Sequence, residues 1–157
     1  MNAQLSIVDT DKQQQPPWLD NFIDIYSLLS VNNLHLLDKL YHQDVIFIDP
    51  IHSLEGRDKL KSYFNNLYSN LVSCDFTIVQ VIHEGNQAAV YWQMKFCHPK
   101  LKSGNEIEVL GSSHIQGIDD KIIYHKDFVD VGAMLYEHIP FVGKLIAFIK
   151  RRASKHE

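Results

Sequence analysis

Asp49 stands where a carboxylate could transfer a proton beside an apolar site. It closes an apolar run at residues 45–48 and is followed by Pro50, which cannot donate to a strand ladder. A carboxylate at an apolar rim has its charged form disfavoured, which moves its pKa toward neutrality and suits general acid–base work. Alternatively, Asp49 only accepts backbone hydrogen bonds in an Asp-Pro turn. His52, three residues later, could orient beside this carboxylate or be a solvated loop histidine.

Other common catalytic chemistries have no matching motif in the sequence. The nine His form no HxH, HExxH or Cys-His cluster at ligand spacing, so we expect no metal site. There is no Gly-rich phosphate loop, and the serines form no GxSxG elbow. We therefore expect a site that works without a cofactor.

The composition indicates one globular domain. The chain has 157 residues, of which 45% are apolar and 22% charged, and no apolar run approaches the ~20 residues of a membrane span. The net charge of −4 argues against nucleic acid as a partner. The first residues have no signal-peptide pattern, and Cys74 and Cys97 form no CxxC pair, so we expect a cytoplasmic protein.

Hydrophobic periodicity predicts the elements that must position Asp49. Residues 1–17 should form a flexible arm, residues 18–138 the main domain, and residues 139–157 an amphipathic helix with a basic tail. The predicted elements of the main domain are helices over 18–29 and 34–41, a strand over 45–48, a helix from 57 to 71, and strands over 76–82, 88–96, 106–118 and 122–130.

Helices that come first and strands that come last predict an α+β fold with an antiparallel sheet. Long strands must bend to wrap around helices, and Gly111 and Gly117 are the predicted bend positions. A curved sheet closed by helices makes a cone-shaped barrel whose mouth can hold a ligand. We expect Asp49 at that mouth.

Two stretches resemble a known superfamily. The run YHQDVIFIDP at 41–50, with Gly56-Arg57-Asp58 after it, and KIIYHKDFVD at 121–130 are similar to the nuclear transport factor 2-like superfamily, in its SnoaL-like and ketosteroid-isomerase-like branches. The resemblance covers about residues 18–138. It implies a cone-shaped α+β barrel, often a homodimer packed through the sheet. Its motifs are specific for fold and poor for function, because this fold hosts several chemistries.

The resemblance also implies roles for individual residues. Asp49 matches the general base of ketosteroid isomerase, and Tyr41, eight residues earlier, keeps the same register. Tyr26 matches the tyrosine that donates to the developing oxyanion, although it could equally be a core aromatic. Asp127 matches the SnoaL-like aspartate that holds water or substrate inside the pocket.

The isomerase's second oxyanion donor, a protonated aspartate, has no counterpart here. The matching strand offers a face with Ser112, His114 and Gln116, so His114 could donate instead. The opposite face of that strand is more apolar. If that face points inward, His114 is merely exposed.

Trp92 and Met94 stand where limonene-type epoxide hydrolases carry an Arg-x-Asp motif, so we do not expect that activity. These two side chains are either the apolar wall of a pocket or simply core. A substrate site would then combine them with Ser112 and His52, beside the catalytic candidates Asp49, Asp127, Tyr26 and His114.

The predicted function is that of a SnoaL-like small-molecule protein with an apolar pocket and an acidic site. As an isomerase, cyclase or dehydratase it would use Asp-based proton transfer on a hydrophobic carbonyl or polyketide-like compound. The alternative is a non-catalytic binding or dimerisation module for a lipid-like ligand. The segment 139–157 is expected to cover its own domain or pack in a dimer, in preference to lying on a membrane surface.

Overall fold

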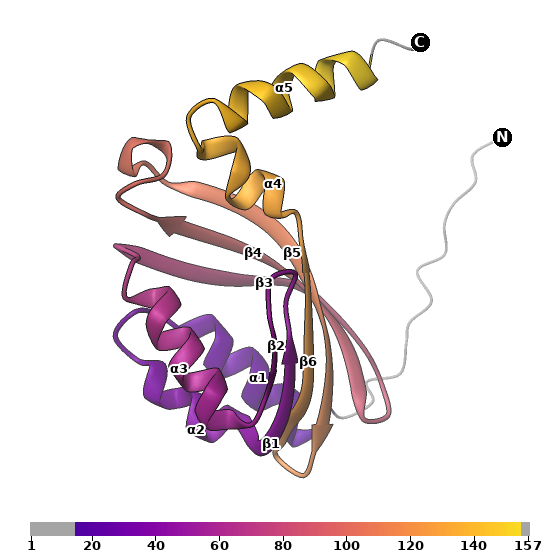
Figure 1. Cartoon of the computed structure of the whole chain (residues 1–157). Helices are drawn as coiled ribbons and strands as arrows, with labels where there is room; N and C mark the ends of the chain where they lie inside the picture. Colours follow the sequence, from indigo (N-terminus) through magenta and orange to yellow (C-terminus); the bar gives the residue numbers. More distant parts are fainter. Residues whose placement is uncertain (1–14, 155–157) are drawn as a thin grey trace, which may run out of the picture.

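The computed structural model describes residues 15–154, which form an α+β fold with helices at both ends (Figure 1). The elements in chain order are α1 (Pro17–Leu28), η1 (Leu34–Leu36), α2 (Leu37–Leu40), β1 (Tyr41–Ile48), β2 (Ser53–Glu55), α3 (Arg57–Tyr68), β3 (Ser73–Glu84), β4 (Gln87–Cys97), η2 (Lys102–Gly104), β5 (Ile107–Ile118), β6 (Lys121–Val129), α4 (Val131–Met134), η3 (Tyr136–His138) and α5 (Val142–Ala153). The predicted arm lies outside the described residues over 1–14.

The segment around β1 differs from its prediction. The helix expected over 34–41 is one 3-10 turn followed by four α-helical residues, because Tyr41 already has an extended backbone and begins β1. The first half of β1 is polar, so its apolar residues predicted a strand only over 45–48. The stretch after Pro50, predicted as a loop, contains β2, which pairs with the end of β1.

The six strands form one curved sheet in the order β2-β1-β6-β5-β4-β3. The predicted antiparallel meander from β3 to β6 is confirmed. The expectation of a wholly antiparallel sheet is wrong, because β1 pairs with β6 in parallel. The meander fixes the direction of β6, and β1 takes the edge that β6 leaves free. The sheet is therefore mixed and remains an open cone instead of a closed barrel.

Two glycines let indole rings lie close to β5. A Cβ on Gly111 would come within 2.2 Å of the Trp92 ring, and one on Gly117 within 2.0 Å of the Trp18 ring. The strand pairing also shifts register between Gln116 and Gly117. At both positions, which were predicted as bends, any side chain would collide with a tryptophan ring.

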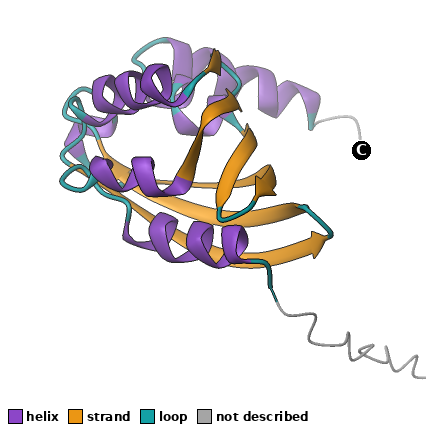
Figure 2. Ribbon diagram, turned by 90° about the horizontal axis from the view of Figure 1, so that it is seen from below, coloured by secondary structure: helices purple, strands orange, loops and turns teal. Residues whose placement is uncertain are grey.

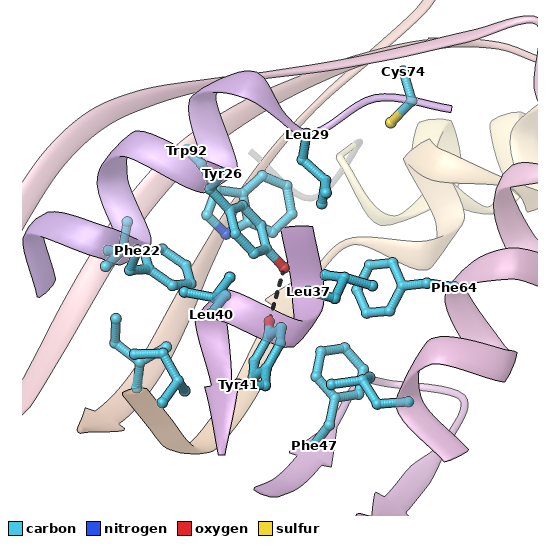
Figure 3. Close-up of a cluster of buried hydrophobic side chains, with 14 of the residues drawn as sticks. Phe22, Tyr26, Leu29, Leu37, Leu40, Tyr41, Phe47, Phe64, Cys74 and Trp92 are labelled. Atoms are coloured by element: carbon cyan, nitrogen blue, oxygen red, sulfur yellow. Dashed lines mark hydrogen bonds between the residues drawn. The ribbon is translucent and has the colours of Figure 1, made fainter. Parts of the chain in front are cut away.

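Helix α1 crosses the inner face of the long strands, which curve around it (Figure 2). It buries Trp18, Leu19, Phe22 and Tyr26 against them. Figure 3 shows the aromatic cluster that results, with Tyr26 pointing toward Tyr41. The core therefore fills the space between the N-terminal helices and the sheet.

The C-terminal elements α4, η3 and α5 follow β6, and unlike α1 they contain no fully buried residue. Asp130 caps α4 by accepting a hydrogen bond from the Ala133 amide at 3.1 Å. Helix α5 then packs mainly on η3. Within residues 15–154, no helix is long and apolar enough to cross a membrane.

Candidate functional site

A cavity of about 330 Å³ lies between the helices and the inner face of the sheet. Its size suits a small ligand. The wall is mostly apolar, with aromatic and aliphatic side chains that include Phe47, Phe64, Phe76, Trp92, Met94 and Phe96. Trp92 and Met94 are thus placed where the sequence allowed for a pocket wall. Tyr26, Asp49 and Asp127 also line this space, so the two carboxylates share one apolar cavity.

Asp127 is the polar group that β6 brings to the cavity. Its Oδ1 accepts a hydrogen bond from the Ser113 hydroxyl at 2.5 Å. The indole N–H of Trp92 donates to that hydroxyl at 2.8 Å, so the single Ser113 proton is available for Asp127. Among residues 15–154, no side chain or amide donates to Asp127 Oδ2. One carboxylate oxygen is therefore held in place and the other is available to a ligand.

His125 connects Asp127 to two tyrosines. This histidine is completely buried, with Nε2 2.7 Å from Asp127 Oδ1 and Nδ1 2.7 Å from the Tyr41 hydroxyl. For a carboxylate at Asp127, which can only accept, and a neutral imidazole, the His125 proton lies on Nε2 and Tyr41 donates to Nδ1. The Tyr26 hydroxyl is 3.5 Å from that of Tyr41, as Figure 3 shows.

Both of these tyrosines remain hydrogen-bond donors at neutral pH. Burial raises the pKa of the Tyr26 phenol well above its ordinary value, and it does the same to the pKa of Tyr41. The five polar side chains form one continuous chain of contacts, which comprises Tyr26, Tyr41, His125, Asp127 and Ser113.

Asp49 lies at the end of β1 and holds the following turn. Its Oδ1 accepts hydrogen bonds from the amides of Ile51 and His52, each at 2.7 Å, and its Oδ2 accepts one from the Tyr63 hydroxyl. Burial, with the Asp49 carboxylate beside it, raises the pKa of Tyr63. The turn predicted as the alternative role is thus present, while Asp49 also lines the cavity.

His52 lies beside Asp49 but outside the cavity lining. Its Nδ1 is 3.7 Å from Asp49 Oδ1, and its ring centroid is 4.6 Å from that of Tyr63. The side chain is 45% exposed. His52 is thus both near the carboxylate and exposed on the loop, the two situations that the sequence left open, and it does not line the cavity.

Ser112 and His114 are placed on the outer face of β5, and neither lines the cavity. His114 Nε2 lies 3.1 Å from the Gln87 side-chain oxygen, and its ring packs on Tyr124. These two residues were expected in the pocket, but the buried side chains of β5 are those of the odd-numbered residues, so both expectations need correction. Ser113, which is 1% exposed, faces inward with the apolar residues of this strand.

Sequence reasoning missed Ser113, His125, Tyr41 and Tyr63 as parts of the site. A signal existed for His125, because alternation places it on the same face of β6 as Asp127. The apolar parity of β5 was the corresponding signal for Ser113. Tyr63 gave none, since its hydroxyl meets Asp49 only through the packing of α3 on β1.

The described residues give no basis for metal or thiolate chemistry in this cavity. Over residues 15–154, no three His, Cys, Asp or Glu side chains gather closely enough to hold a metal ion. Cys74 lines the cavity, but burial raises the pKa of its thiol to about 11. The Cys74 side chain is therefore a neutral wall group at physiological pH.

A family model of the SnoaL-like domain matches residues 22–125. The chain belongs to this family. The match includes Tyr26, Asp49 and Ser113 and ends at His125, two residues before Asp127. The membership confirms the superfamily predicted from the sequence. No curated protein matches the chain in sequence.

Solved structures with a similar fold include proteins whose names refer to the same superfamily. One is a ketosteroid isomerase-like protein from Catenulispora acidiphila in complex with trimethylamine; it has 13% identity and a TM-score of 0.66, and covers 77% of this chain and 91% of that chain. An NTF2-like protein from Burkholderia pseudomallei has 10% identity and a TM-score of 0.66, with 77% and 96% covered. TerC, co-crystallised with polyporic acid, has 15% identity and a TM-score of 0.65, with 75% and 95% covered. At these identities the likeness establishes the fold.

Proposed function

We propose that this SnoaL-like protein binds an apolar small molecule in the cavity and that Asp127 exchanges a proton with it. The observation that carries this proposal is the asymmetry of the Asp127 carboxylate. Ser113 and His125 fix one oxygen, while the other has no protein partner among residues 15–154 and belongs to a group lining an apolar space. A carboxylate that is oriented and shielded from water is suited to general acid–base catalysis.

The chemistry that fits this arrangement is proton transfer next to a carbonyl group. Asp127 would remove a proton from the carbon beside the carbonyl, and the C–H electron pair would move to form an enolate. The Tyr26 phenol lines the cavity and stays protonated, so it is the candidate donor to the enolate oxygen. Return of the proton from Asp127 to another carbon completes an isomerisation. In a dehydration, Asp127 would instead give this proton to a hydroxyl on the adjacent β-carbon; the C–O bond breaks, the enolate electrons form the new C=C bond and water leaves.

Asp49 and Tyr63 form a second polar end of the same cavity. Both Asp49 oxygens already accept hydrogen bonds, so we assign this pair to orienting a polar group of the ligand, with Asp127 as the main proton carrier. This reverses the order of importance that the sequence suggested. It also fits a hydrophobic carbonyl or polyketide-like compound with oxygens at two ends.

The experiment starts from whatever compound purifies with the protein. Solvent extraction and mass spectrometry identify it, and the compound is then incubated with protein in D2O to detect deuterium at its acidic carbon. We expect exchange with the wild type and at least about a hundredfold slower exchange with Asp127→Asn, while binding persists. Polyporic acid, the compound found with TerC, is the first binding probe if nothing co-purifies.

Asp130→Asn is the matched control, because Asp130 caps α4 and does not line the cavity. It should exchange as fast as the wild type. Exchange that is equally fast in Asp127→Asn would remove the acid–base role of this residue.

A binding function without catalysis is the second candidate. It is favoured by the internal hydrogen bonds to both carboxylate oxygens of Asp49, which leave Asp127 Oδ2 as the one carboxylate oxygen of the cavity without a partner among residues 15–154. In that case the wild type would bind the extracted compound tightly and incorporate no deuterium.

We also propose a homodimer through the outer face of the sheet. Tyr91, Ser112 and Phe128 lie side by side across β4, β5 and β6, next to Leu110, which is 69% exposed. Exposed apolar side chains that cluster on one face are typical of protein interfaces. Light scattering should give a dimer mass for the wild type and a monomer mass for Leu110→Asp/Phe128→Asp.

A further inference from the structure

Helix α5 has an apolar face that no other part of residues 15–154 covers. None of its residues is buried, and Phe141 at its start is 82% exposed. Leu145, Phe148 and Ile149 are each more than half exposed. Figure 1 shows α5 standing apart from the sheet. Such a face needs an occupant outside the described fold.

The position of α5 is nevertheless defined at its start. A Cβ on Gly143 would lie 2.2 Å from the Glu137 carbonyl oxygen, so the first turn packs closely on η3. The Glu137 carboxylate also pairs with Lys150. Among the described residues, those that line the cavity include none from α5, so this helix is not the expected lid.

Positive and negative charges are distributed unequally between the C-terminal segment that contains α5 and the rest of the chain. Residues 139–157 contain five Lys and Arg and one Glu, a net charge of +4, whereas residues 1–138 contain ten Lys and Arg and 18 Asp and Glu, a net charge of −8. Within α5 there is no acidic residue at all. The apolar face is therefore attached to the cationic segment of an otherwise acidic protein.

This combination is complementary to one kind of surface. The exposed side chains Phe141, Leu145, Phe148 and Ile149 follow the i, i+4, i+7, i+8 spacing of a single helical stripe, and the basic side chains stand beside or beyond it. Apolar insertion combined with cations at the headgroups is how amphipathic helices bind anionic bilayers. A second copy of α5 would cover the apolar face but would offer no acidic residue of α5 to these cations.

We propose that α5 lies in the headgroup region of an anionic lipid bilayer. Phe141, Leu145 and Phe148 enter the apolar boundary, and Arg151 and Arg152 contact lipid phosphates. This binding is independent of any ligand in the cavity.

The test is flotation of the full chain with vesicles of phosphatidylcholine, with or without phosphatidylglycerol. The wild type should float with the anionic vesicles at low salt, at least about tenfold less with pure phosphatidylcholine, and less as salt increases. Leu145→Ser/Phe148→Ser and Arg151→Glu/Arg152→Glu should each lose at least about tenfold in binding. These side chains are exposed, so circular dichroism should show a folded protein.

Two substitutions elsewhere serve as matched controls. Val79→Ser removes an exposed apolar side chain from β3, and Lys100→Glu reverses an exposed charge outside α5. Both should float like the wild type. The proposal is overturned if the wild type does not float with anionic vesicles, or if the α5 variants float equally well. It is also overturned if Leu145→Ser/Phe148→Ser turns a dimer into a monomer, which would show that a second copy covers α5.

Discussion

Helices α1 and α5 both have 12 residues and an apolar stripe, yet their surroundings are opposite. Phe22 of α1 is completely buried, whereas Phe148 of α5 is 52% exposed. The inner face of the sheet is already covered by the earlier helices, and α5 packs instead on η3, outside that core. An amphipathic pattern thus predicts that a helix has a face to cover, while the fold decides whether the same chain covers it.

The most direct way to break this comparison is the same substitution in both helices. Phe22→Ala should lower the free energy of unfolding by about 3–5 kcal/mol, because it leaves a cavity in the core. Phe148→Ala should change it by less than about 0.5 kcal/mol, since its surroundings are solvent in the isolated chain. Urea denaturation measures both values. Similar losses for the two variants would mean that α5 is packed against the domain in solution.

The alkylation rate of Cys74 tests whether the cavity wall stays closed in the folded protein. Burial raises the pKa of its thiol to about 11, so at pH 8 little thiolate is present. In a Cys97→Ser background, alkylation at pH 8 should be on the order of a hundredfold slower than for free cysteine and should accelerate toward pH 11. Mass spectrometry follows the reaction. Rapid alkylation in the folded protein at pH 8 would show that the cavity wall opens.

Two neighbouring serines test the same contrast across a single strand. Ser113→Ala should destabilise the protein by about 1–3 kcal/mol, because Trp92 loses its acceptor and Asp127 loses a donor. Ser112→Ala, on the outer face, should have an effect within about 0.5 kcal/mol. Thermal and urea unfolding provide the comparison. Equal effects would contradict the assigned parity of β5.

The smallest expected effect on stability concerns Asp38, a partly exposed carboxylate outside the cavity. The 2.7 Å hydrogen bond from Lys61, together with the charges of Arg57 and Lys121, lowers the pKa of Asp38. Because the Asp38 side chain is 42% exposed, so that solvent screens its ion pairs, Asp38→Asn should lower stability by less than about 1 kcal/mol at pH 7.

The pH dependence of this effect has a definite sign. A lowered pKa stabilises the folded protein above the ordinary aspartate pKa, and this contribution is lost as the pH falls through the lowered value. The urea midpoints of the wild type and Asp38→Asn should therefore converge in acid. A difference that persists there would assign the effect to packing.

Much of the site could be predicted because its residues lie on strands with clear alternation. Asp127 and His125 fall on one face of β6 by parity alone, and Trp92 and Met94 share a face of β4. The parity of β5 was ambiguous, because both faces contain polar residues near Gly111. The burial of Ile107, Val109 and Ile115, together with Ser113, identifies its inner face.

The sequence by itself determined most of the elements: the helices that form α1 and α3, four meandering strands and an amphipathic C-terminal helix, each from its own local periodicity. The tertiary structure decided the parallel pairing of β1 with β6 and the contact between Tyr41 and His125, which are 84 residues apart. The reason is physical. Local periodicity records which side of an element is apolar, whereas the pairing of distant strands depends on which edges and faces remain free once the other elements have packed.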